Sequence, residues 1–306
     1  MPDNHTTVPL EVVEITFDSP DQLFEFFRTE QLRPSRWIFR GQQSASWPLQ
    51  PTLERFEDSI RDLQWVIEPY CVRQFQRRAH HYSLDLPDRE ELLEWIALMR
   101  HHGCPTRLLD FSKSPYIAAF FATAEADPKD DASIWAVDTS ALAVLATQMF
   151  TQEINSMMAL GKPENGVSFR FSEGKLFHKI MANTNLLWPK VILPVEPFRT
   201  NERVLVQQGV FLCPSSAHCT FEQCLQSVQE FAKKRPDPQH PFLYRLTIRA
   251  DVCPFVLREL HRMNLNYASL YPGLDGLARS LATVSKIRAT TVPYSHRPDW
   301  EFDLDL

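Results

Sequence analysis

The spacing of hydrophobic residues changes along the chain and predicts helices and strands in an irregular order. After Ser19-Pro20, a pair that suits the start of a helix, the apolar positions 23, 26 and 27 fall on one helical face. Short apolar runs predict strands at 36–41, 133–137 and 190–195, and alternating apolar positions predict another at 242–248. The segments with a helical pattern further along are 57–82, 89–102, 116–126, 140–158, 173–181, 221–234, 254–263 and 274–284.

The segment 202–212 has the pattern of a hairpin, because short apolar runs at 204–206 and 210–212 flank Gln207-Gln208-Gly209. Strands scattered among helices, with a hairpin late in the chain, indicate an α+β fold rather than a regular alternation of strand and helix. We expect a single domain over residues 19–286. A flexible terminus at 1–18 would precede it, and an acidic tail at 287–306 would follow it.

Composition and charge limit the classes of function. Hydrophobic residues make up 44% of the 306 residues, which is enough for a large core. The formal net charge of −6 argues against non-specific binding of nucleic acid by the whole surface, although it leaves room for a local basic cleft. The six cysteines form no CxxC pair and no Cys/His cluster with zinc spacing, so we expect no metal site. We find no signal segment and no apolar run of about 20 residues, and therefore expect a cytoplasmic protein with reduced thiols and no membrane contact.

Chemically distinct side chains crowd into residues 101–115, which is unusual for a segment that only builds a core. Ser114 and Pro115 suit the start of a helix whose next residues, 116–122, are almost wholly apolar and therefore expected to be buried. The free N–H groups at such a helix start suit an anion. The candidate ligand-binding residues of this segment are His101, His102, Thr106, Arg107, Asp110, Ser112 and Ser114.

Arg40 stands at the end of a predicted strand and is followed by Gly41, a position that suits a ligand-facing guanidinium. The competing interpretation is a surface arginine in a surface ion pair, because exposed arginine is common. Asp110 also has two interpretations: a carboxylate that acts on a ligand, or a structural partner of Arg107. No helix opens with GxGxxG or GxxxxGK[ST], so we expect neither of the nucleotide sites built on those sequences.

Together these residues permit one kind of chemistry on a nucleotide. Arg40 would clamp a phosphate, a hydroxyl of Ser112 or Ser114 would orient it, and loop N–H groups would take a pyrophosphate. A carboxylate on a later strand would stabilise the oxocarbenium ion that forms when the bond between ribose and nicotinamide breaks. NAD is therefore the expected co-substrate.

Several segments also share a pattern with a known family. They are Phe39-Arg40-Gly41, His101-His102-Gly103-Cys104-Pro105-Thr106-Arg107-Leu108-Leu109-Asp110, the apolar residues 118–122, and the later segments 203–211 and 270–278. In these segments the chain resembles the FRG domain family, which is named for its Phe-Arg-Gly triplet. The resemblance covers most of the chain and implies that residues 19–286 form one FRG domain.

The order of three features is also similar to the Arg–Ser–Glu class of ADP-ribosyltransferases. They are an aromatic-Arg-Gly strand, a Ser-x-Ser before an Ala/Phe-rich helix, and a late hairpin with Gly-x-Phe. This resemblance implies a split, twisted antiparallel sheet with large helical insertions. It also implies transfer of ADP-ribose from NAD to a macromolecular acceptor, protein or nucleic acid, by a toxin or anti-phage defence effector. It also implies that NAD is bound by Arg40, Gly41, His101, His102, Thr106, Arg107, Ser112 and Ser114. The residues that it implies for catalysis are Glu202, Gln207, Gln208 and Asp110.

The chain departs from that class at the catalytic position. Arg203 stands where the class has Glu, and Glu202 is one residue away, which on a strand means the opposite face. Two other interpretations therefore stay open. The domain would recognise a nucleotide or nucleic acid without catalysis, or the polar segment would be a buried network that holds the sheet together.

Overall fold

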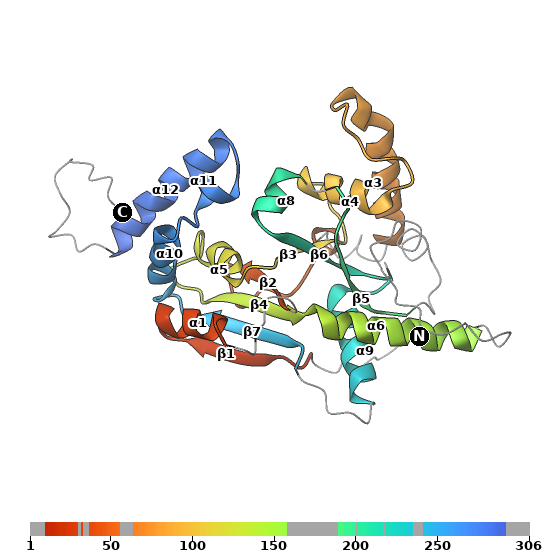
Figure 1. The fold of residues 1–306 in the computed structure, drawn as a ribbon, viewed down its shortest axis with the longest axis horizontal. Coiled ribbons are helices and arrows are strands. Elements are labelled where there is room, and N and C mark those ends of the chain that lie inside the picture. The colour runs from red at the N-terminus through yellow and green to blue at the C-terminus, as the bar shows by residue number, and fades with distance from the viewer. Residues whose placement is uncertain are drawn as a thin grey trace.

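The structure is a computed structural model that describes residues 10–29, 32, 37–55, 64–157, 189–199, 201–216, 218–234 and 241–291. A seven-stranded sheet runs through this part of the molecule (Figure 1). In sheet order its strands are β1 (Val13–Phe17), β7 (Leu243–Ile248), β4 (Ala132–Asp138), β2 (Trp37–Gln42), β3 (Leu109–Ser112), β6 (Gly209–Pro214) and β5 (Ile192–Val195). Neighbouring strands are antiparallel apart from the parallel pair β1–β7. The predicted α+β class is confirmed.

Helices cover both faces of the sheet (Figure 1). On one face the core includes α1 (Pro20–Phe27), α5 (Pro115–Thr123) and α10 (Cys253–Arg262), and on the other it includes α4 (Leu92–His101), α6 (Thr139–Met157) and α9 (Phe221–Lys233). Alternate residues of β2 enter the two cores, Phe39 the first and Ile38 the second. The remaining helices are α3 (Gln64–Arg78), α8 (Glu202–Val206), α11 (Tyr267–Leu270), α12 (Leu274–Thr291) and the short 3₁₀ helices η2 (Thr52–Arg55) and η3 (Ala79–His81).

Local sequence signals decide where several helices begin and end. The side chains of Ser19 and Ser114 each accept a hydrogen bond, at 3.3 Å, from the backbone N–H three residues later, and a proline follows each of them. Thr220 and Gln223 form a capping box at the start of α9. Gly103, at φ +82°, follows the end of α4. These positions agree with the sequence predictions.

The predicted hairpin at 202–212 is wrong in its first half. Residues Glu202–Val206 form α8, because the side chain of Asn201 accepts a hydrogen bond from the N–H of Val204 at 2.9 Å and caps a helical turn. Gln207 and Gln208 then form a turn, with Gln208 at φ +48°, before β6 begins. The cap outweighs the strand propensity of the apolar run 204–206.

Two strands lie where the sequence predicted loops. β1 falls inside the expected flexible terminus 1–18, and its pairing with β7 holds it in the sheet. β3 falls inside the polar segment 101–115, between β2 and β6. At the other end, α12 continues to Thr291, past residue 287, where the acidic tail was expected to begin. The helix predicted at 173–181 lies outside the described residues.

Gly41 allows α5 to lie directly against β2. A Cβ added at Gly41 would be 2.0 Å from the carbonyl oxygen of Ala118 and 2.6 Å from the backbone nitrogen of Ala122. Because both are backbone atoms of one helix, the clash can be relieved only by moving that helix. We expect Gly41→Ala to lower the free energy of unfolding by about 1–3 kcal/mol or more, measured by urea denaturation.

Gly103→Asn is the matched control for this prediction. Nothing lies within 4 Å of a Cβ built at Gly103, and Asn tolerates its positive φ. This variant should therefore keep nearly the stability of the wild type. Equal losses in the two variants would contradict the explanation by close packing.

Candidate functional site

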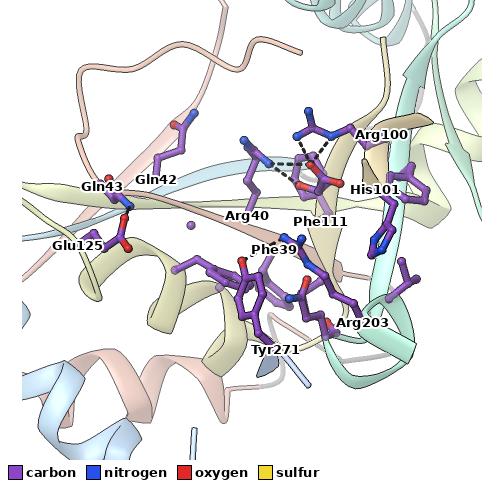
Figure 2. A pocket seen from close by; sticks show the side chains of 18 of the residues that line it. Phe39, Arg40, Gln42, Gln43, Arg100, His101, Phe111, Glu125, Arg203 and Tyr271 are labelled. Carbon is purple, nitrogen blue, oxygen red and sulfur yellow. Dashed lines mark hydrogen bonds and ion pairs between the residues drawn. The ribbon is translucent and has the colours of Figure 1, made fainter. Parts of the chain in front are cut away.

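A cavity of about 540 Å³ opens beside Arg40 (Figure 2). Its walls come from β2, β3, α4, α5 and α8, together with residues of α11 and α12. Ligand pockets have volumes of about 300–1,000 Å³, so the cavity has room for a small organic ligand.

The sheet splits where it borders this cavity. Between β2 and β3 a single pair, Phe39 with Ser112, is in register, whereas all four residues of β3 pair with β6. Beyond that pair the Nη1 of Arg40 donates a hydrogen bond to the backbone carbonyl of Asp110 at 2.8 Å. A guanidinium therefore takes the place that a backbone N–H of β2 would occupy in a continuous ladder.

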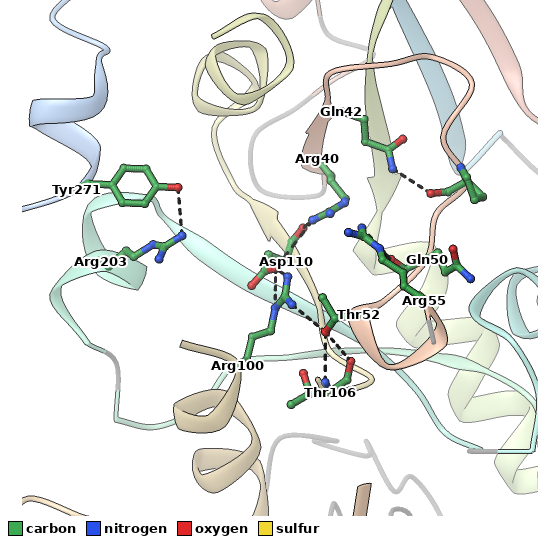
Figure 3. Close-up of polar contacts among 11 residues, drawn as sticks. Arg40, Gln42, Gln50, Thr52, Arg55, Arg100, Thr106, Asp110, Arg203 and Tyr271 are labelled. Carbon is green, nitrogen blue, oxygen red and sulfur yellow. Dashed lines mark hydrogen bonds and ion pairs between the residues drawn. The ribbon is translucent and has the colours of Figure 1, made fainter. Parts of the chain in front are cut away.

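The carboxylate of Asp110 is the negative centre of this end of the cavity (Figure 3). Its Oδ2 accepts hydrogen bonds from the Nε of Arg100 at 2.9 Å and from Arg100 Nη2, and the Nη1 of Arg40 lies 3.9 Å away. Arg100 also donates to Thr52 Oγ1 at 2.9 Å, which connects the network to η2. Burial alone would raise the pKa of Asp110, but the charge of Arg100, followed by that of Arg40, holds this pKa below its ordinary value. Asp110 is thus an anion whose charge is already paired.

Arginine dominates the charge of the cavity wall. Among the described residues the lining has five arginines against two carboxylates, Asp110 and Glu125, in a chain whose net charge is −6. The five are Arg40, Arg55, Arg100, Arg203 and Arg279. Burial lowers the pKa of Arg40 to about 10, with Asp110 opposing the shift and the neighbouring arginines adding to it. Burial and repulsion by Arg100 also lower the pKa of Arg55. An anion in the cavity would relieve this repulsion.

The Nε–H donor of Arg40 also favours an anion in the cavity. Its Nε is buried and has no hydrogen-bond partner among the described residues. A buried donor without a partner costs about 1–3 kcal/mol. Since a guanidinium presents its N–H groups in a planar fork that matches phosphate oxygens, an anion beside Arg40 would satisfy this donor.

The facing wall is aromatic (Figure 2). The guanidinium carbon of Arg203 lies 4.3 Å from the ring centre of Tyr271, and its Nη2 donates to the Tyr271 hydroxyl at 3.1 Å. Arg279 lies 5.2 Å from the ring centre of Tyr267. Aromatic and guanidinium planes of this kind stack on flat rings such as nucleobases.

Glu125 lies at the opposite end of the cavity from Arg100 (Figure 2). It accepts hydrogen bonds from the Tyr267 hydroxyl at 2.8 Å and from Gln43 Nε2 at 3.4 Å. Burial, followed by the hydrogen bond to Glu125, raises the pKa of Tyr267, so its hydroxyl remains a donor at neutral pH. The cavity therefore has a cationic end and an end with a carboxylate.

Residues 35–131 match the sequence model of the FRG domain. The chain carries an FRG domain. The match contains Arg40, Arg100 and Asp110, the residues of the cationic end, whereas Arg203 and Tyr271 of the aromatic wall lie later in the chain. No curated protein and no solved structure matches the chain.

Two further features were searched for in the part of the chain that the structure describes. In that part no helix is long and apolar enough to cross a membrane. No group of three or more His, Cys, Asp or Glu side chains there could hold a metal ion.

Half of the twelve predicted site residues line the FRG cavity: Arg40, Gly41, His101, Asp110, Ser112 and Gln207. His101 rather than His102 faces it, and burial, followed by repulsion from His102, lowers the pKa of His101. The hydroxyl of Ser112 donates to the carbonyl of Gln207 at 2.8 Å and accepts from the N–H of Ser114 at 3.0 Å. Ser112 therefore holds the turn after α8 against β3.

The other six predicted residues do not line the cavity. Arg107 pairs with Glu68 in the interior, Thr106 is buried beside η2, and Ser114 caps α5. Glu202, His102 and Gln208 are exposed elsewhere, Glu202 because α8 is a helix and not a strand. Glu202, which was predicted to be catalytic, therefore does not line the cavity.

Several lining residues were not predicted: Arg55, Arg100, Glu125, Tyr267 and Arg279. A local signal existed for two of them. Glu125 is the one charged residue of the apolar segment 116–126, and Arg100 directly precedes His101. Tyr267 and Arg279 reach the cavity only because α10, which precedes them, packs on α5.

The buried ion pair of Arg107 and Glu68 should matter for stability. Backbone N–H and Nε of Arg107 both donate to the Glu68 carboxylate, and the side chains are 6% and 2% exposed. Arg107→Ala leaves a buried carboxylate without its partner, so we expect the free energy of unfolding to fall by about 3–5 kcal/mol in urea denaturation. Arg199→Ala removes an exposed ion pair with Asp85 and should cost far less. A similar small loss in both variants would show that Arg107 is not the structural residue described here.

Proposed function

We propose that the FRG domain of this chain recognises a phosphorylated nucleotide in the cavity beside Arg40, with NAD as the candidate dinucleotide. The observation that carries the proposal is the buried, unpartnered Nε of Arg40 inside a lining with five arginines and two carboxylates. A phosphate or pyrophosphate supplies the acceptors and the negative charge that this arrangement lacks.

The rest of the cavity supports a nucleotide over a simple anion. Arg40, Arg55 and Arg100 gather at one end, where phosphates would lie (Figure 3). Tyr271 and Arg203 form a flat wall across from Arg40, on which a base would stack. Glu125 would accept hydrogen bonds from ribose hydroxyls or base amines at the far end.

The environments of Asp110 and Glu202 support nucleotide recognition better than transfer of ADP-ribose. Stabilising an oxocarbenium ion requires a carboxylate whose charge is free to act on the sugar. Asp110 is held by Arg100 and lies near Arg40, so its charge is already neutralised. Glu202 is exposed outside the cavity.

Calorimetric titration of the purified chain with NAD, ADP, pyrophosphate and adenosine tests this function. We expect the three phosphorylated compounds to bind and adenosine to bind much more weakly. Arg55→Ala should weaken the binding of ADP about 10- to 100-fold, because a hydrogen bond to a charged group contributes about 1.5–3 kcal/mol. Arg40→Lys keeps the charge but removes the fork of donors, and should also weaken it.

Arg249→Ala is the matched control, since Arg249 is an exposed arginine in an ion pair with Asp251 and does not line the cavity. It should leave every affinity unchanged. A folded wild type that binds none of the phosphorylated compounds would refute the proposal. Binding of an oligonucleotide that ADP does not displace would instead assign the domain to nucleic-acid recognition.

NAD-dependent ADP-ribosyl transfer is the second candidate, and Glu125 favours it. Among the described residues Glu125 forms hydrogen bonds with Tyr267 and Gln43 but no ion pair, so its charge is available inside the cavity. The split beside Arg40 also agrees with the split sheet that the resemblance to ADP-ribosyltransferases implies. In this case the domain would modify a protein or nucleic acid, as a toxin or anti-phage defence effector does.

Release of nicotinamide from NAD distinguishes the two candidates. If the domain transfers ADP-ribose, Glu125→Gln should abolish release with little effect on NAD affinity, whereas Glu202→Gln should leave release unchanged. Chromatography of the reaction, with and without a cell lysate as the source of acceptor, measures it. Binding of NAD without any release of nicotinamide would leave recognition as the function.

A further inference from the structure

Two cysteines flank the start of α9, away from the cavity. Cys219 precedes the N-cap Thr220, and Cys224 is the fourth residue of the helix. Their Sγ atoms lie 2.8 Å apart, and the two residues are 6% and 0% exposed. Apolar side chains at these two positions commonly pack on each other and fix the entry of the chain into the helix, but here both side chains are thiols.

We propose that Cys219 and Cys224 form a dithiol site that a hydroperoxide oxidises to a reversible disulfide. The two sulfurs are already in contact. Because a typical S–S bond is about 2.05 Å long, they need to approach by less than 1 Å to form the bond. The proposal is independent of the ligand of the cavity.

The surroundings assign different roles to the two thiols. A hydrogen bond from Cys224 lowers the pKa of Cys219 against the effect of burial, and Lys190 adds to this shift. Burial raises the pKa of Cys224. Cys219 is therefore the thiol that ionises and attacks first, and Cys224 is the one that resolves the product.

The reaction balances with one hydroperoxide molecule. The Cys219 thiolate attacks one peroxide oxygen, the O–O bond breaks, and Cys219 becomes a sulfenic acid while hydroxide leaves. The sulfur of Cys224 then attacks the sulfur of Cys219, losing its own proton, and the sulfenic oxygen leaves as water. Two thiols and hydrogen peroxide give one disulfide and two waters, and a thiol reductant reverses the step.

Three of the other cysteines, Cys104, Cys213 and Cys253, are less suited to this reaction. Burial raises the pKa of Cys213 to about 12 and that of Cys253 to about 11. Burial, followed by the charge of Cys71, raises the pKa of Cys104 to about 11. These thiols stay protonated at neutral pH and react slowly. Oxidation should thus begin at the start of α9.

This helix start is also linked to the cavity. The N–H of Phe221 donates to Glu54 Oε1 at 2.8 Å. Glu54 belongs to η2, which supplies Arg55 to the cavity and Thr52 to the network of Arg100. A disulfide at Cys219 and Cys224 therefore lies directly behind the cationic end.

Peptide mapping of the peroxide-treated full chain tests the site. After denaturation, the number of thiols that iodoacetamide alkylates should fall from six to four. Glu222 lies between the two cysteines, so a glutamate-specific protease cuts between them. The two resulting peptides should stay joined until a reductant is added.

Three results would overturn the proposal: alkylation of all six cysteines, a bond between Cys71 and Cys104 in its place, or sulfinic acid at Cys219 without the bond. Because the wild type alone gives these readings, the test does not depend on the folding of a variant. Cys224→Ala should trap the sulfenic acid of Cys219, which dimedone labels. Cys213→Ala is the matched control and should keep the bond between Cys219 and Cys224.

Discussion

The insertion of one guanidinium into the ladder between β2 and β3 shapes the centre of this molecule. Arg40 occupies the gap after the pair of Phe39 and Ser112, and its positive charge can stay there because the Asp110 carboxylate lies beside it. Arg100 fixes that carboxylate from α4. Two strands and a helix are thus joined through side chains where a continuous sheet would use backbone groups, and residues of both strands line the cavity beside this junction.

The polar segment 101–115 serves stability and the cavity through different residues. Arg107 is buried with Glu68, and Ser114 caps a helix, so neither contacts the cavity. His101 and Asp110 face it. The interpretation as a buried network thus describes Arg107, whereas His101 and Asp110 line the cavity. The two sets of residues are carried by different parts of the segment: His101 ends α4 and Asp110 lies on β3, whereas Arg107 and Ser114 lie just outside β3.

Features set by a few neighbouring residues could be predicted from the sequence. The starts of α1, α5 and α9, the end of α4 and the position of Arg40 at the cavity depend on short patterns of cap residues, proline and glycine. Features that depend on partners far away in the sequence could not be predicted in this way. β1 is a strand because β7 pairs with it, and Tyr271 reaches the cavity because of how the last helices pack. The predicted hairpin was wrong where the Asn201 cap starts a helix before the apolar run 204–206.

The edge pair β1–β7 has a consequence for how the molecule assembles. Val13 pairs with Tyr244, so the partner strand of β1 is synthesised 231 residues after it. Pairing over such a separation closes a very long loop and is slow compared with local contacts. While the chain is being made, β1 is an unpaired strand with free N–H and C=O groups, the kind of edge that joins other chains. This strand pair can therefore form only after residues 13–248 have left the ribosome.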